Sequence, residues 1–397
     1  MGGMCGTMFF VLLLRHMKPR VVWLCSWYPN ELDRFTGDFI QRHAVAASEL
    51  AEIDVVHVVP GGSVKKTMVS VVNASLRETI IYTGSTSKVA RYWSMWKAYR
   101  RFFNGYETEH GKPDLLHVHV AFPAGLFGRI WKHKWQIPMV LTEHYGIYNT
   151  TVDDAFPTRS FLFQQATRRA VGAANLVLPV SEALAKGMMQ YVGQFPYKVV
   201  PNVVDTELFY NQLLALPSPF QFIHVSNMAP VKNISGILKA FAEVVARRND
   251  VELHLVGAQP AQYIEEARQL GLLNKTVYFH AECTYAEVAE KVRSAHCGVL
   301  FSDSEMLPCS LLEWLCTGMP VIATRVGGIP EAINSTNGIL VEAGNERGLT
   351  EAMLTMMEQY ANYNPHQIAL EAVKQYSYSS VGKQISDVYT LLLSNKK

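Results

Sequence analysis

The chain has 397 residues, of which 49% are hydrophobic and 18% are charged, a composition typical of a compact globular protein and not of a disordered one. This length exceeds what one core usually organises, so two domains of ordinary size are expected. Lysine and arginine total 36 against 34 acidic residues, and this balance lacks the basic excess of a nucleic-acid-binding protein.

The cysteines and the N-terminal residues bear on the cellular compartment of the protein. The six cysteines form no Cys-x-x-Cys pair and no spacing typical of a metal site. Because most lie in apolar stretches, we expect reduced core residues and a cytosolic protein. The apolar residues 8–14 are too few to span a bilayer and are followed by basic residues, not by a cleavage site. Residues 1–16 are therefore expected to be a disordered extension, with a short membrane-touching anchor as the alternative.

Apolar runs that end at polar turns predict parallel strands through the first half of the chain. These strands are expected at residues 21–25, 53–59, 114–120, 138–142 and 176–180. Gly37 lies at the turn between the first strand and a helix, where the lack of a side chain lets the backbone approach a phosphate closely. His144 follows the strand at 138–142, and a histidine at a strand's carboxyl end can hydrogen-bond a ligand hydroxyl.

Two stretches of the first half are both basic and aromatic. Residues 88–103 have a helical pattern and carry five basic residues and no acidic one, and residues 125–135 repeat this character. Such helices can lie on an anionic membrane surface. Ordinary helices with tryptophans in the core and arginines in solvent fit the pattern as well, so both alternatives stay open.

The second half again alternates strands and helices, beginning with a strand at residues 220–225. Lys232 stands just before the helix expected at residues 237–247, where a cation can join backbone N–H groups in binding a diphosphate. Residues 211–219 are polar and bounded by proline, which is typical of a linker. We therefore expect one domain over residues 17–210 and a second over residues 211–375.

Residues 297–324 have the pattern strand, loop, helix, strand. Glu305 lies in the loop, Pro308 suits the first turn of the helix, and Glu313 follows on that helix. Free N–H groups at the helix start, such as that of Leu307, make a site for an anion, and a carboxylate beside it can hold hydroxyl groups. The alternative makes Glu305 an N-cap and Glu313 a solvated helix residue.

Glu305 and Glu313, followed by Gly-Met-Pro-Val-Ile-Ala-Thr-Arg-Val-Gly-Gly-Ile-Pro-Glu at residues 318–331, resemble the carboxyl-terminal signature of the family 4 glycosyltransferases. Further matches to this family are Gly37-Asp38-Phe39, the Thr-Glu-His ending at His144, the Pro-Asn-x-x-Asp of residues 201–205, and Lys232. The resemblance covers most of the chain. It implies an α/β protein of the GT-B fold, with two doubly wound Rossmann-like domains facing across a cleft, and a terminal helix at residues 376–397 that returns to the first domain.

The resemblance also implies a retaining enzyme that transfers a sugar from a UDP- or GDP-linked nucleotide diphosphate sugar to a hydroxyl acceptor. Glu305, Lys232 and His144 are then the expected catalytic residues, with Glu305 and His144 at the sugar and Lys232 at the phosphates. The expected donor-binding residues are Gly37, Asn233, Met306, Leu307 and Glu313, the last at the ribose. The family works without an obligatory metal ion, so no cofactor is expected. Many members have arginine where this chain has Asn227, so phosphate binding is expected to be weaker or differently arranged.

The basic and aromatic stretches lie in the half that takes the acceptor in the resembled enzymes. The expected partners are therefore a glycan or lipid-linked acceptor of cell-surface polysaccharide synthesis and an anionic membrane surface, without nucleic acid. The expected location is cytoplasmic and peripheral on the inner face of the membrane. Two alternatives keep the fold: a nucleotide-sugar 2-epimerase, which needs no acceptor, and a protein that binds nucleotide sugar without turnover.

Overall fold

The computed structural model describes residues 18–61, 65–84, 87–149, 154–212 and 218–394, so the extension expected at residues 1–16 lies outside the described residues. Contacts group the chain into two compact units. The first comprises Met1–Glu143, Gln165–Val177 and Gly382–Lys397, and the second comprises His144–Gln164 and Leu178–Val381. These contacts assign residues 178–210 to the second unit, whereas the sequence predicts that the second domain begins at residue 211. Every strand of the second sheet follows residue 219. The expected domain bounds therefore stay a prediction.

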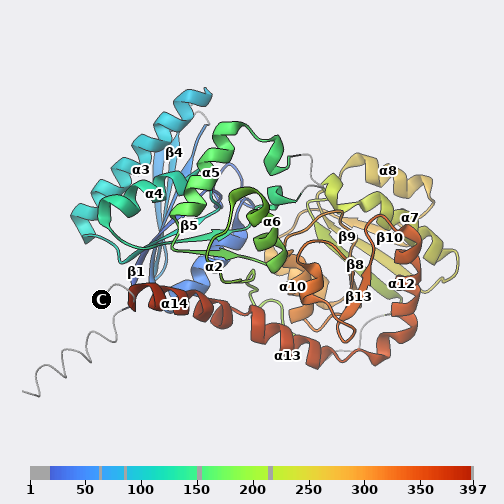
Figure 1. Ribbon diagram of the computed structural model, residues 1–397. Coiled ribbons are helices and arrows are strands. Elements are labelled where there is room, and N and C mark those ends of the chain that lie inside the picture. Colours follow the sequence, from blue (N-terminus) through green and yellow to red (C-terminus); the bar gives the residue numbers. More distant parts are fainter. Residues whose placement is uncertain (1–17, 62–64, 85–86, 150–153, 213–217, 395–397) are drawn as a thin grey trace, which may run out of the picture. The chain divides into compact units, whose positions relative to one another are not determined.

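The first sheet has seven strands in the order β3-β4-β2-β1-β5-β6-β7 (Figure 1). The strands are β1 (Arg20–Cys25), β2 (Glu52–Val59), β3 (Lys65–Asn73), β4 (Leu76–Thr83), β5 (Leu115–His119), β6 (Met139–Glu143) and β7 (Leu176–Pro179). The connecting helices are α2 (Asp38–Ser48), α3 (Lys88–His110), α4 (Ala124–Trp135) and α5 (Phe161–Ala173). The pairs from β4 to β6 are parallel, whereas the edge strand β3 runs antiparallel to β4. This is the parallel α/β architecture that the sequence predicts.

Helices α3 and α4 contribute an aromatic layer to the core of the first unit. Trp131 and Trp135 of α4 are only 4% and 3% exposed, and the Trp131 ring stacks on Phe103 of α3 with 4.4 Å between centroids. The basic and aromatic character of α4 is therefore that of a core helix, and its tryptophans cannot reach a membrane surface. The membrane expectation rests on α3 alone. Among the described residues, no helix is both long and apolar enough to span a bilayer.

The last helix, α14 (Tyr378–Ser394), is tied to the first sheet by buried hydrogen bonds. Trp23 Nε1 of β1 donates to the Tyr389 hydroxyl at 3.1 Å, and that hydroxyl lies 2.7 Å from His117 Nδ1 of β5. All three side chains are fully buried. Burial lowers the pKa of His117 well below its ordinary value, so this imidazole is neutral and serves the fold.

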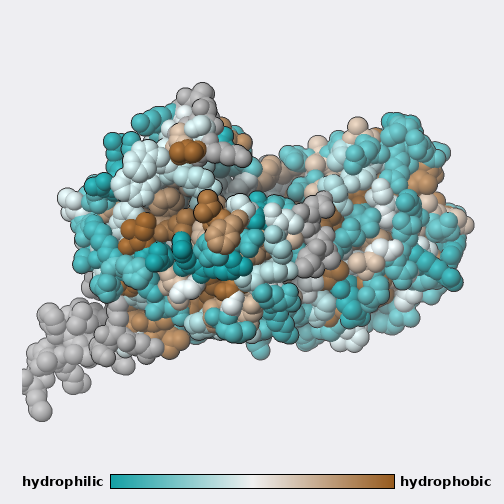
Figure 2. All heavy atoms as spheres, turned by 45° about the horizontal axis from the view of Figure 1, so that its top comes forward, coloured by the Kyte–Doolittle hydropathy of each residue, from teal (hydrophilic) through white to brown (hydrophobic). Residues whose placement is uncertain are grey.

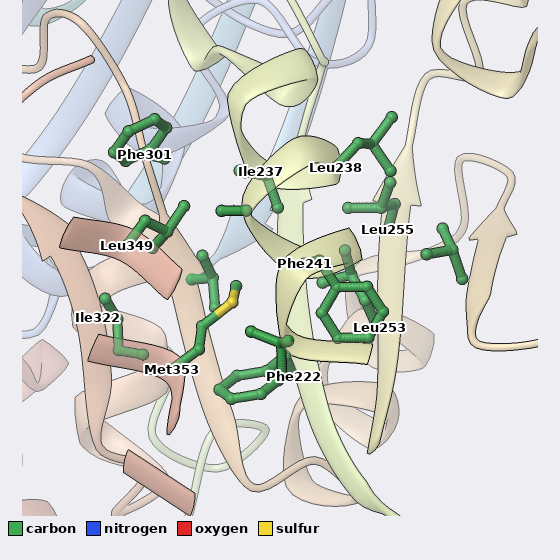
Figure 3. Packing of buried hydrophobic residues seen from close by; sticks show 14 of the residues in the cluster. Phe222, Ile237, Leu238, Phe241, Leu253, Leu255, Phe301, Ile322, Leu349 and Met353 are labelled. Carbon is green, nitrogen blue, oxygen red and sulfur yellow. The ribbon is translucent and has the colours of Figure 1, made fainter. Parts of the chain in front are cut away.

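The second sheet is parallel throughout, in the order β10-β9-β8-β11-β12-β13. Its strands are β8 (Phe220–Ser226), β9 (Val251–Gly257), β10 (Val277–His280), β11 (Cys297–Leu300), β12 (Val321–Thr324) and β13 (Gly338–Val341). The helices of this unit are α6 (Glu182–Val192), α7 (Ile234–Val245), α8 (Ala261–Gln269), α9 (Tyr285–Arg293), α10 (Cys309–Cys316), α11 (Ile329–Ala332), α12 (Glu346–Gln359) and α13 (Pro365–Tyr376). Figure 3 shows the core between this sheet and helices α7 and α12, where Phe241 and Met353 meet Phe222 of β8. The two doubly wound Rossmann-like domains expected from the sequence are thus present.

Candidate active site

The second sheet reverses its winding between β8 and β11. These strands are neighbours in the sheet although β9 and β10 lie between them in the sequence. Open α/β sheets bind ligands at such a switch point, beyond the carboxyl ends of the strands. The short 3-10 helix Pro230–Lys232 follows β8, and the loop that contains Glu305 follows β11. The two candidates with opposite charge therefore flank the switch point.

Lys232 and Glu305 form an ion pair across the two loops. Lys232 Nζ lies 2.5 Å from Glu305 Oε1, and the two side chains are only 19% and 10% exposed. The Ser302 hydroxyl donates to the same carboxylate oxygen at 2.8 Å. Glu305 is therefore bound to a cation and does not cap α10, whose N-cap is Pro308 with no side-chain hydrogen bond. The start of α10 keeps the partial positive charge that attracts anions.

The loop around Glu305 is held by the Gly-Gly turn after β12. Gly327 has a φ of 52°, and a Cβ on it would lie 1.6 Å from the Glu305 carbonyl oxygen. Gly328 N donates to the Met306 carbonyl at 2.9 Å. Asn202 Nδ2 donates to the Leu307 carbonyl at 2.7 Å, which gives a structural reason for the Pro-Asn-x-x-Asp sequence. The backbone at Met306 and Leu307 is therefore held in place by contacts with the Gly-Gly turn and with Asn202.

Glu331, which ends the signature sequence, acts on a different helix. Its carboxylate accepts hydrogen bonds from the backbone N–H groups of Glu182 and Ala183 at 2.9 and 2.8 Å, at the start of α6. A carboxylate there satisfies N–H groups that lack helical partners and matches the helix dipole. This part of the signature is thus explained by the fold.

Glu313 lies on α10 and is only 5% exposed, which excludes the alternative of a solvated helix residue. The hydroxyl of Tyr285, the first residue of α9, donates to Glu313 Oε1 at 2.7 Å. A buried carboxylate that accepts a tyrosine hydrogen bond is held in one orientation. Sequence reasoning missed Tyr285, because the contact joins residues on two helices that no local pattern relates.

Asn233 has a clear local role at the start of α7. It adopts the left-handed conformation with a φ of 49°, and its Oδ1 accepts from Gly236 N at 3.1 Å as an N-cap. The neighbouring loops are also joined by Asp303 N, which donates to the Val231 carbonyl at 2.9 Å. Asn233 therefore helps to set the position of Lys232, while its predicted contact with a donor stays a prediction.

A buried histidine lies under this site. His224 of β8 is fully buried, with Nδ1 2.8 Å from the Val299 carbonyl and Nε2 2.7 Å from the Ser226 hydroxyl. Burial, reinforced by the charge of Lys232, lowers the pKa of His224 to about 4. The imidazole is therefore neutral at physiological pH and adds no second positive charge beneath Lys232.

Of the eight candidates, Gly37 lies in the first unit and the other seven in the second. Gly37 is the N-cap of α2 with a φ of 73°, and a Cβ on it would lie 2.7 Å from the Trp27 backbone. His144 is half-buried and directly follows Glu143, whose Oε2 accepts from Ala121 N at 3.1 Å. The structure brings Lys232, Asn233 and the Glu305 loop together at the switch point. That this region binds phosphate stays a prediction.

A cavity of about 220 Å³ adjoins the Glu305 loop within the second unit. Met306 and Gly327 line it together with Tyr148, Asn149 and Gln190, whose side chains carry polar groups. Such a cavity can hold a small polar ligand by hydrogen bonds. Among the described residues, no group of three or more histidine, cysteine, aspartate or glutamate side chains is placed to hold a metal ion.

Two family models match the chain. The model described as Glycosyltransferase Family 4 matches residues 20–208, and the model described as Glycosyl transferases group 1 matches residues 219–359. The N-acetyl-alpha-D-glucosaminyl L-malate synthase of Bacillus anthracis is 26% identical over 300 residues, which cover 72% of this chain and 76% of that protein. The D-inositol 3-phosphate glycosyltransferase of Corynebacterium glutamicum (strain R) is 23% identical over 308 residues, covering 71% and 73%.

Solved structures share the fold across almost the whole chain. The sucrose-phosphate synthase from Thermosynechococcus elongatus matches with a TM-score of 0.78 and 18% identity, covering 95% of this chain and 100% of that one. The Anabaena protein HepE, solved with UDP and glucose, matches with a TM-score of 0.70 and 18% identity, covering 94% and 100%. At these identities the likeness concerns the fold alone.

Proposed function

The chain belongs to the family 4 glycosyltransferases and has their GT-B fold, and we propose that it transfers a sugar from a UDP- or GDP-linked donor to a hydroxyl acceptor with retained anomeric configuration. Both family models describe glycosyltransferases, which favours transfer over the epimerase and the binding protein without turnover. HepE, with the same fold, was solved with UDP and glucose, which supports a nucleotide diphosphate sugar as donor here.

The Lys232–Glu305 pair is the observation that carries the proposal. Glu305 neutralises Lys232 and holds its ammonium group at the switch point, with 2.5 Å between Lys232 Nζ and Glu305 Oε1. A diphosphate at the start of α10 would attract Lys232 and release part of the Glu305 carboxylate. That carboxylate would then accept hydrogen bonds from the sugar hydroxyl groups, so one pair serves both halves of the donor.

The reaction breaks the bond between the anomeric carbon and the diphosphate oxygen. A bond forms between that carbon and the acceptor oxygen on the same face of the sugar, and the acceptor proton passes to the leaving diphosphate. Lys232 and the N–H groups at the start of α10 stabilise the negative charge that grows on the diphosphate, and one such donor is typically worth about 3–4 kcal/mol. No protein nucleophile is required.

We assign to the remaining candidates the roles that the family resemblance implies. Glu313, oriented by Tyr285, would accept from the ribose hydroxyls. His144 would contact the transferred sugar, and Gly37 would bring the backbone close to the diphosphate. Asn227 supplies no cation and its Oδ1 accepts from Ala229 N at 3.2 Å, so Lys232 is the main cationic side chain that we assign to the phosphates. The proposal requires no metal ion.

Thermal unfolding in the presence of nucleotides tests the donor proposal. A ligand at 100 times its Kd stabilises a protein by about 2.7 kcal/mol. We expect UDP or GDP and one matching nucleotide sugar to raise the Tm by several degrees, and the Lys232→Gln variant to lose most of this shift. If no uridine or guanosine diphosphate changes the Tm of the unmodified protein, the donor proposal is wrong.

For the acceptor, we infer a lipid-linked glycan of cell-surface polysaccharide synthesis at an anionic membrane surface. The support comes from the N-terminal part of α3, where Val89, Tyr92 and Trp93 are 83%, 50% and 57% exposed. Arg91 is exposed beside them. Apolar and aromatic side chains with neighbouring cations are the groups that dock on such membranes. Figure 2 shows brown and pale residues among the teal ones on the face of the first unit where α3 runs.

Co-sedimentation with vesicles tests the membrane part. We expect binding to anionic but not to neutral vesicles, since each basic residue near an anionic surface contributes about 1 kcal/mol. Salt should weaken this binding because it screens exposed charges. Trp93→Ser should reduce the bound fraction, whereas Leu370→Ser, which removes a side chain of similar exposure on α13, should not. Negligible binding to both vesicle types would reject membrane docking and leave the transferase proposal intact.

A further inference from the structure

An open groove of about 840 Å³ runs between the hairpin β3–β4 and the N-terminal half of α3, within the first unit. None of the candidates from the sequence lines it. A smaller cavity of about 210 Å³ continues along α3 and shares Arg101 with the groove. Its uncharged polar lining includes Thr67, Thr83 and Asn104.

The groove is strongly cationic. Five of its lining residues are lysine or arginine, and no aspartate or glutamate is among them. Lys66 is paired with Glu31 outside the groove. Within the described part of the chain, no ion pair joins Lys65, Lys97, Arg100 or Arg101 to an acidic residue. Cations gathered on one concave surface repel each other and concentrate anionic ligands.

The two tryptophans of the groove stack on each other, and each also contacts a cationic side chain. The rings of Trp93 and Trp96 lie parallel within 7°, with 5.0 Å between centroids. Lys97 Nζ lies 5.5 Å from the Trp93 ring, and the Arg100 guanidinium lies 5.1 Å from the Trp96 ring. Each cation is thus fixed on an aromatic face while its N–H groups stay available.

The exposed Trp93 is not needed for the packing of α3. The buried side of that helix consists of Met95, Tyr99, Phe103 and Tyr106, none more than 5% exposed. Trp93 is 57% exposed and projects from another side of the helix. Exposed large aromatic residues beside a groove are typical of a ligand-binding surface and have no role in the core.

We propose that this groove binds an anionic oligosaccharide, a glycan with carboxylate or phosphate groups, as the non-reacting part of the acceptor. The acidic groups would pair with Lys97, Arg100 and Arg101, and the exposed part of the Trp93 ring would pack against apolar carbons of the sugar rings. Thr67, Thr83 and Asn104 supply hydrogen bonds for sugar hydroxyls. A concave groove encloses a chain-like ligand, whereas a flat lipid surface would contact only its rim. The proposal rests on the transfer reaction proposed above.

Binding of two trisaccharides of equal length tests the proposal. Trigalacturonate carries carboxylates and maltotriose is neutral, and both can be titrated while the tryptophan fluorescence is followed. We expect trigalacturonate to bind at least about tenfold more tightly than maltotriose, a difference of about 1.4 kcal/mol. This preference should shrink at high salt, because exposed charges are screened. Equal binding of both sugars, or binding of neither, would overturn the proposal.

Paired substitutions locate the site. Arg100→Gln combined with Arg101→Gln should weaken trigalacturonate binding about tenfold or more. Lys239→Gln combined with Arg247→Gln removes two comparably exposed charges from the second unit and should leave the affinity within about twofold. Because Arg100 packs on Trp96, the double variant also removes a packing contact. Trp93→Ala removes an exposed side chain with little risk to folding, and it should weaken trigalacturonate binding as well. Equal losses in the groove variant and the control would overturn the proposal.

The same variants separate this inference from the donor proposal and from membrane docking. The Arg100 and Arg101 double variant should keep the Tm shift caused by the nucleotide sugar, because those residues lie outside the donor site. Absence of that shift in the unmodified protein, with trigalacturonate still bound, would reject the donor proposal alone. If the double variant loses vesicle binding while the unmodified protein ignores trigalacturonate, the groove serves a lipid surface and the glycan proposal is wrong.

Discussion

The two units carry their positive charges in contrasting ways. In the second unit, Lys232 is 19% exposed and paired with a carboxylate at the carboxyl edge of the sheet. In the first unit, Lys97 and Arg100 lie on the faces of stacked tryptophans along an open groove. A half-buried, oriented charge acts strongly on a nearby reacting group, whereas exposed charges are screened and mainly attract and select partners. On the two proposals above, the second unit carries the phosphate chemistry and the first unit captures the acceptor.

Replacing Lys232 should produce the largest effect. Lys232→Gln removes a charge that stabilises the leaving diphosphate, so we expect the turnover number to fall by about 10²–10³-fold. Arg100→Gln should change turnover less than tenfold once the acceptor is saturating, because it acts on acceptor binding. Release of nucleotide diphosphate measures both. Similar losses of turnover in both variants would remove the contrast between the units.

A glycine pair tests how rigidly the Glu305 loop is held. In Gly327→Ala the new Cβ would meet the Glu305 carbonyl, so we expect unfolding to become easier by about 2–4 kcal/mol. Gly344 also has a positive φ, 72°, but has nothing within 4 Å of its Cβ position. Gly344→Ala should therefore cost only about 1–2 kcal/mol. Urea unfolding of both variants checks this, and equal losses would mean that the Gly327 contact does not hold the loop.

A smaller effect is expected at Tyr285. Tyr285→Phe removes the hydrogen bond to Glu313 and keeps the ring, so the KM for the donor should rise about fivefold with little change in kcat. Tyr278→Phe is the matched control, since the Tyr278 hydroxyl donates only to the Lys275 carbonyl on the surface. A fall in kcat without a change in KM would place Tyr285 at the reacting atoms and not behind the ribose.

The sequence predicted the two sheets because their buried strands are short apolar runs with polar ends. It predicted less of β3, because the residues of that strand are almost all exposed and form no buried apolar run. Helix α13 was also missed, although Asn364 caps it and Pro365 occupies its first turn, the usual signals of a helix start. Both failures come from segments whose apolar pattern is weak.

At the site, residue types were predictable and contacts were not. The sequence predicted Lys232 and Glu305 as site residues, but they are 73 positions apart and only the strand order makes them a pair. The sequence could not tell the buried Trp131 from the exposed Trp93, because one basic and aromatic pattern fits both a core helix and a binding surface. Tertiary packing decides between the two.

The Glu305→Gln variant tests the central claim most directly, by comparing donor affinity with turnover. The amide cannot neutralise Lys232, so the diphosphate meets a free ammonium, and we expect donor affinity to be unchanged or slightly tighter. Turnover should fall by about 100-fold or more, because the contact with the sugar is lost in the transition state. Titration of the matching nucleotide sugar and single-turnover transfer measure the two quantities. Near-normal transfer by Glu305→Gln, or a loss of donor affinity as large as the loss of turnover, would contradict the account.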